Sequence, residues 1–131
     1  MFNEKSMQVL FGHWAKSIMW ADSAAFELKL CKEKRFNLKR IEDHQIKNLQ
    51  LVEGRGLFYK IPDEGMAQKP FDGFVLKGRA YLVLMFYKPR QLKTCYLIPI
   101  VTIIGKIEDG IKSIDEKEAS NLAQVTFILK S

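Results

Sequence analysis

The sequence has little cysteine and no long apolar run. Its 131 residues include two cysteines, Cys31 and Cys95, whose spacing does not suit a metal site. We therefore expect free thiols in a reducing compartment. The longest apolar run, residues 96–105, is too short to cross a bilayer, and no amino-terminal signal pattern precedes the first predicted helix. These absences predict a soluble, intracellular, cytoplasmic protein with no membrane partner.

The composition is that of an ordinary globular chain. Apolar residues make up 47% and charged residues 27%, which excludes a disordered chain. A chain of this length forms one domain, residues 1–131, and buries enough surface for a core of its own. The net charge of +6 predicts a polyanionic partner, although charge alone does not distinguish nucleic acid from an anionic membrane surface. The small size suggests a phage or mobile-element protein.

Periodicity predicts a mixed sheet flanked by helices, an α/β or α+β class. The expected helices are residues 4–19, 41–53 and 113–121, the last opened by a capping box from Ser113 to Glu116. The expected strands are residues 24–30, 57–61, 94–104 and 123–129, together with a hairpin of 71–76 and 80–87.

One strand carries an unusual pair of charges. In residues 24–30, alternation places Phe26, Leu28 and Leu30 on one face and puts Glu27 with Lys29 on the other. Charges on a packed face are costly, so the pair indicates a cleft that holds a metal ion and a phosphate. The alternative is an edge strand whose charges are solvated.

Such a site needs a second carboxylate. Two carboxylates offer hard oxygen ligands to Mg2+ or Mn2+, and a nearby lysine stabilises the negative charge that develops during phosphodiester hydrolysis. Asp72 is the better candidate to join Glu27 as a metal ligand, because it opens an apolar strand. Asp22, five residues before Glu27, is the alternative, and Asp72 could instead be an ordinary strand-start aspartate.

A basic segment and a polar helix follow the charged strand. Gln45 is expected to face the strand and assist catalysis, whereas His44 more often has a structural role. Five cations between the strand and this helix predict a surface that binds the DNA backbone: Lys32, Lys34, Arg35, Lys39 and Arg40.

These features together resemble a known nuclease family. The segments Phe26-Glu27-Leu28-Lys29, Phe36-Asn37-Leu38 and Ile41 with His44-Gln45-Ile46 occur in the order found in RecU-type Holliday junction resolvases. The resemblance covers roughly residues 24–60 closely. It implies the restriction-endonuclease-like core of the PD-(D/E)XK superfamily, magnesium-dependent cleavage of branched DNA, and a homodimer.

The sequence departs from this family before the charged strand. The family places its aspartate on a hairpin about a dozen residues before the glutamate, and no such hairpin fits before Glu27. The segment Pro70-Phe71-Asp72 resembles a displaced equivalent, which predicts a rearranged core. Two alternatives remain: a related nuclease acting on other DNA in restriction or repair, and a nucleic-acid-binding module that keeps the fold but does not cut.

Overall fold

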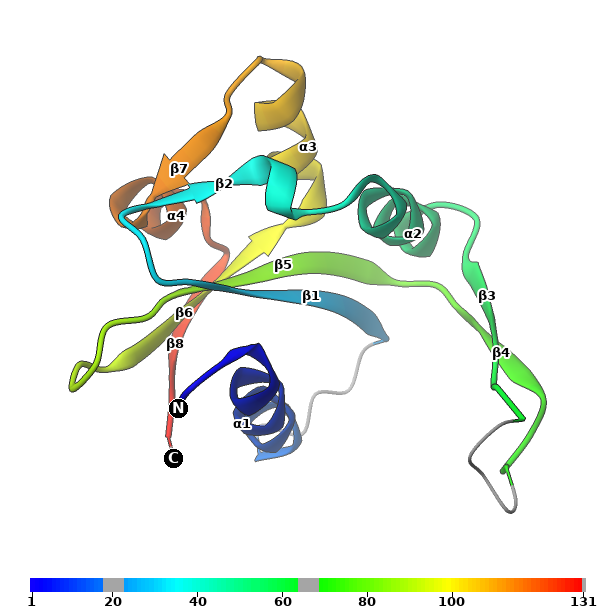
Figure 1. Cartoon of the computed structure of the whole chain (residues 1–131). Coiled ribbons are helices and arrows are strands. Elements are labelled where there is room, and N and C mark those ends of the chain that lie inside the picture. The colour runs from blue at the N-terminus through cyan, green and yellow to red at the C-terminus, as the bar shows by residue number, and fades with distance from the viewer. Residues whose placement is uncertain (18–22, 64–68, 131) are drawn as a thin grey trace.

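The computed structural model describes residues 1–17, 23–63 and 69–130. At its centre is a four-stranded sheet in the order β1 (Ala24–Cys31), β5 (Arg79–Phe86), β6 (Lys93–Pro99) and β8 (Val125–Leu129). β1 runs parallel to β5, and the remaining neighbours are antiparallel. The predicted mixed central sheet is therefore confirmed, with β1 at one edge of it (Figure 1).

Helices cover both faces of this sheet (Figure 1). On one face lies α1 (Glu4–Ser17), whose buried Met7 and Phe11 belong to one core cluster. The other face carries the second core cluster and three helices: α2 (Asp43–Glu53), α3 (Ile100–Glu108) and α4 (Glu116–Leu122). None of the described helices is long and apolar enough to cross a membrane.

Two small antiparallel sheets form hydrogen-bonded pairs separate from the central sheet. The first pairs β2 (Arg35–Asn37) with β7 (Ser113–Asp115), and the 3-10 helix η1 (Leu38–Arg40) follows β2. The second pairs β3 (Leu57–Lys60) with β4 (Gly73–Leu76). In Figure 1 the β3–β4 pair extends away from the body of the molecule.

Helix α2 ends where its glycines predict. The Gly54 amide donates a hydrogen bond to the Gln50 carbonyl (3.0 Å), and the Gly56 amide donates one to the Leu51 carbonyl (2.6 Å). Gly56 has a φ of 100°, a left-handed conformation that side chains with a Cβ rarely adopt. The helix therefore stops at Glu53 and the chain turns into β3.

The predicted hairpin of residues 71–76 and 80–87 is wrong. β4 pairs with β3, whereas β5 pairs with β1 and β6. The amide of Gly78 donates to the Val52 carbonyl (2.9 Å), and a Cβ added at Gly78 would lie 2.1 Å from the Ser23 carbonyl oxygen. Residues 77–79 therefore lead the chain from the small sheet onto the central one, instead of turning it back.

The predicted strand of residues 94–104 is also wrong beyond Pro99. There β6 ends and α3 begins, because proline cannot donate to a strand ladder but suits a helix start. Ile100 and Ile103 favour a strand by propensity, yet both are fully buried on one side of α3. Burial of this helix face outweighs the local preference.

The capping box lies two residues later than predicted. The Glu118 amide donates to the Asp115 side chain (2.8 Å), and the Asp115 amide donates to the Glu118 side chain (3.2 Å). Ser113 belongs to β7 instead, because residues 113–115 pair with β2.

The contact between Gly78 and Ser23 makes a direct prediction. Gly78→Ala should lower the free energy of unfolding by about 1–3 kcal/mol, because the new methyl group has to displace backbone. The matched control is Gly105→Ala in α3, where a Cβ would meet no atom within 4 Å. This control should raise stability by up to about 1 kcal/mol. Urea unfolding of both variants measures the difference, and equal midpoints would contradict the assigned contact.

Candidate active site and nucleic-acid interface

The two faces of β1 differ as alternation predicts. Phe26, Leu28 and Leu30 pack in the core cluster that contains α1. Ala25 and Cys31 belong to the cluster on the opposite face, beneath α2 and α3. Glu27 and Lys29 alternate with these last residues, so both point to the face that α2 covers.

Glu27 and Lys29 form an ion pair in a largely dry environment. The Lys29 Nζ lies 3.4 Å from a Glu27 carboxylate oxygen, and the side chains are only 11% and 23% exposed. Their neighbours in β5 are Leu82 opposite Glu27 and Leu84 opposite Lys29, both fully buried. Replacing such a pair by apolar residues often leaves stability equal or higher, so burial alone does not explain it.

β1 is an edge strand, and Arg40 reaches its outer edge. Among the described strands only β5 pairs with β1. The Arg40 guanidinium donates to the carbonyl of Leu30 (2.9 Å), lies 3.6 Å from the Glu4 carboxylate, and stands over the Phe36 ring. Arg40 therefore links η1 to α1 and to β1, and its contact in β1 is Leu30, the residue after Lys29.

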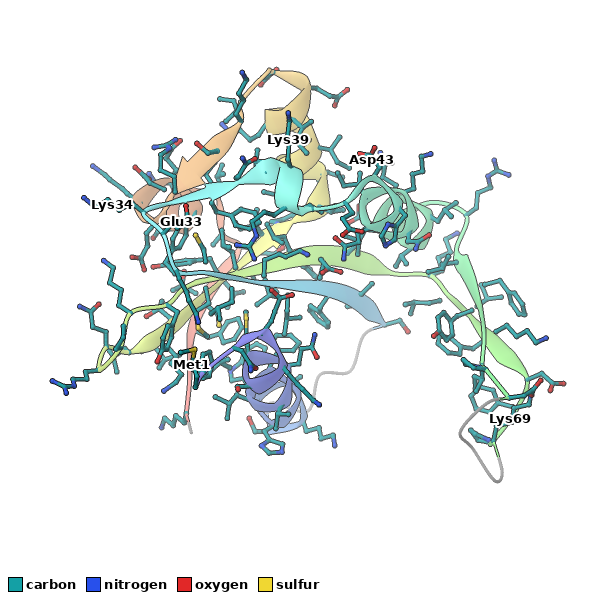
Figure 2. The ribbon with its side chains drawn as sticks, in the orientation of Figure 1. Met1, Glu33, Lys34, Lys39, Asp43 and Lys69 are labelled. Carbon is teal, nitrogen blue, oxygen red and sulfur yellow. The ribbon has the colours of Figure 1, made fainter. Side chains whose placement is uncertain are left out.

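The structure does not place Asp72 beside Glu27. The Asp72 side chain is 94% exposed and pairs with Lys69 at 3.2 Å; Lys69 also pairs with Asp63. Figure 2 shows Lys69 at the outer end of the β3–β4 pair, away from β1. The role of Asp72 therefore remains a prediction that this geometry does not support.

The metal site is incomplete in the part of the chain that the structure describes. No group of three or more histidine, cysteine or acidic side chains that could hold a metal ion is found within residues 1–17, 23–63 and 69–130. Glu27 supplies one carboxylate, and Mg2+ is usually held by one or two carboxylates together with water and phosphate oxygens. Asp22, the alternative second ligand, lies outside the described residues.

Gln45 is the third residue of α2 and helps to cap the helix. Its side-chain oxygen accepts a hydrogen bond from the Glu42 amide (3.0 Å), so this oxygen already has a partner. The amide nitrogen of the same half-buried side chain has no acceptor among the described residues, which leaves it able to donate to a phosphate. His44 is exposed and lies 3.2 Å from the Glu42 carboxylate.

The five predicted DNA-binding cations separate into two groups. Arg35 contacts Ser113, Asp115 and Glu118, and so fastens β2 to β7 and α4. Arg40 has the three contacts described above. The exposed cations that remain are Lys32, Lys34 and Lys39. Figure 2 shows Lys34 and Lys39 directed away from the body of the molecule, on the side of the sheet that carries α2.

Two other titratable groups are buried and stay protonated. Burial raises the pKa of Cys95 to about 12. Burial and a hydrogen bond to Glu116 (2.7 Å) raise the pKa of Tyr96 to about 12. Cys31 and Cys95 are both free and buried, which confirms the expected free thiols. Neither Cys95 nor Tyr96 is ionised near neutral pH, so neither serves there as a nucleophile or a base.

Comparison with known proteins adds no relative. No protein-family model, curated protein or solved structure matches this chain. The assignment of function therefore depends on the geometry of β1 and its surroundings.

Arg40 and Lys39 provide a matched test of the two kinds of cation. Arg40→Met should lower the free energy of unfolding by about 1–3 kcal/mol, because it leaves the Leu30 carbonyl without its donor. Lys39→Met, one residue earlier and exposed, should change stability by less than about 0.5 kcal/mol. Denaturant unfolding of both variants checks this, and equal losses would show that Arg40 is not a structural residue.

Proposed function

We propose that the chain is a metal-dependent DNA endonuclease, most similar to a Holliday junction resolvase. The observation that carries this proposal is the Glu27–Lys29 pair. A carboxylate and an ammonium lie together, with little exposure to solvent, on the α2 face of an edge strand. Exposed lysines and the free amide of Gln45 follow within one short segment of chain.

Each residue has a distinct role in this proposal. Glu27 is a ligand of Mg2+ or Mn2+, and Lys29 stabilises the negative charge that develops on the phosphate. The bound metal would polarise the scissile phosphate and lower the pKa of a water molecule. The Gln45 amide would donate to a phosphate oxygen. Lys29 is suited to its role because a largely desolvated ammonium interacts more strongly with a nearby anion.

The second carboxylate is assigned to Asp22 in this proposal. It lies two residues before the start of β1, so the chain allows it to approach the same strand. Asp72 would require the exposed end of the β3–β4 pair to approach β1. Resolution of a junction needs two symmetric cuts, which favours a homodimer with one such site in each copy.

The second candidate is a DNA-binding module that does not cut. One observation favours it: the described residues contribute a single carboxylate beside Lys29. The exposed lysines would bind DNA without a metal in both cases. The two candidates therefore differ in whether the protein also cleaves DNA when metal is present.

The decisive test is cleavage of a labelled four-way junction beside a matched linear duplex, with Mg2+ or with EDTA. Glu27→Gln and Asp22→Asn should each lower the cleavage rate by at least about a hundredfold, because both remove a metal ligand. Asp72→Asn and its neighbour Asp63→Asn should cut at the wild-type rate, since both lie at the exposed end of the β3–β4 pair.

The outcomes separate the alternatives. Equal cutting of junction and duplex would support a nuclease with another DNA substrate. Loss of activity in Asp72→Asn but not in Asp22→Asn would identify Asp72, and not Asp22, as the second metal ligand. DNA binding without metal-dependent cutting by the wild type would overturn the enzyme and leave the binding module.

The salt dependence of DNA binding tests the basic surface. The double variant Lys34→Gln/Lys39→Gln should bind DNA more weakly. The slope of the logarithm of the binding constant against the logarithm of the salt concentration should become shallower by roughly 1.8, because two phosphate contacts are lost. The control variant Lys5→Gln/Lys16→Gln removes the same charge from exposed positions on α1, across the sheet. Its slope should stay close to wild type, and equal effects in both variants would place the DNA elsewhere.

A further inference from the structure

The β3–β4 arm, defined here as residues 57–60 and 71–76, exposes an unusual amount of apolar surface. Among the described residues its two four-residue strands pair only with each other, in a sheet that extends from the body (Figure 1). Large apolar side chains of the arm are 42–67% exposed: Phe58, Tyr59, Phe71, Phe74 and Val75. A two-stranded hairpin is marginally stable in water, so such a surface indicates a binding role.

The arm carries aromatic rings on both of its faces. Tyr59 and Phe74 are cross-strand partners with ring centroids 5.6 Å apart, and Phe71 meets Phe74 edge-on at 6.4 Å. On the other face, the Phe58 ring lies over Gly73, where an added Cβ would come within 3.0 Å of it. The rings are therefore supported from beneath while their outer surfaces remain in solvent.

Among the described residues, cations outnumber carboxylates around these rings, and three of the cations have no ion-pair partner. At the outer end Lys69 pairs with both Asp63 and Asp72 and so offsets one of their two negative charges. In contrast, Lys60, Lys77 and Arg55 are exposed and have no carboxylate within ion-pair distance among the described residues. Aromatic surfaces beside unpaired cations are the combination that binds single-stranded nucleic acid, with bases stacked on rings and phosphates near the cations.

We propose that the β3–β4 arm binds unpaired nucleotides, with Phe58 stacking on a base. This inference rests on the proposed DNA-binding function and assigns to the arm the single-stranded part of the substrate. A second copy of the chain fits less well, because it would bring the same unpaired cations against those of the first.

The test measures binding without metal, so that cleavage plays no part. The probes are a short single-stranded oligonucleotide containing 2-aminopurine and a matched duplex, both in EDTA. Phe58→Leu keeps an apolar side chain over Gly73 but removes the ring. It should weaken single-strand binding by about five- to a hundredfold and abolish the quenching of 2-aminopurine, while duplex affinity changes less than about twofold.

Two further variants isolate the ring. Phe58→Tyr should bind the single strand as the wild type does, because an aromatic face is restored. Leu92→Ala removes an exposed apolar side chain outside the arm and should have no effect. Thermal unfolding of each variant confirms that the fold is kept.

Several results would overturn the role of the arm. The first is a wild-type protein that neither binds the single strand nor quenches its 2-aminopurine fluorescence. The second is an equal loss of single-strand and duplex affinity in Phe58→Leu. A wild-type dimer that Phe58→Leu converts to a monomer in sedimentation would instead identify a second copy as the occupant. The proposed function is tested by duplex binding and metal-dependent cutting by the wild type. These measurements are independent of the results above, so the two proposals can fail separately.

Discussion

The charged pair Glu27–Lys29 is the constraint that distinguishes β1, because two opposite charges lie together on a strand that is otherwise packed. Glu27 and Lys29 face the same side of β1, opposite leucines that water does not reach. Their mutual attraction offsets part of the cost of desolvation, and an apolar pair would avoid that cost altogether. The proposed action on phosphate would give a reason to keep the charges, because the same low exposure would strengthen their effect on an anion.

The parallel pairing of β1 and β5 places the rest of the chain around this pair. Parallel neighbours need a long connection, and here it carries β2, η1, α2 and the β3–β4 arm. Helix α2 returns over the face that holds the pair, while Arg40 fastens η1 to the outer edge of β1. The connection thus supplies both the cover of the candidate site and the exposed lysines beside it.

The candidate functions lie on different parts of the molecule. The charged pair belongs to the central sheet, where packing on both faces restricts movement. In the described part of the chain, the strands of the β3–β4 arm pair only with each other, and their aromatic rings are exposed to solvent. A rigid site for chemistry and an exposed arm for unpaired bases would suit a substrate that contains both duplex and single-stranded DNA.

The sequence by itself determined the local features: the charge alternation of β1, the presence of α1 and α2, and the end of α2 at Glu53. These follow from the period of the apolar residues and from glycine conformations, which neighbouring residues decide. The partner of β5, the start of α3 after Pro99, and the distance of Asp72 from β1 needed the tertiary structure. They depend on contacts between residues far apart in the chain, such as Gly78 with Ser23, which no local pattern contains.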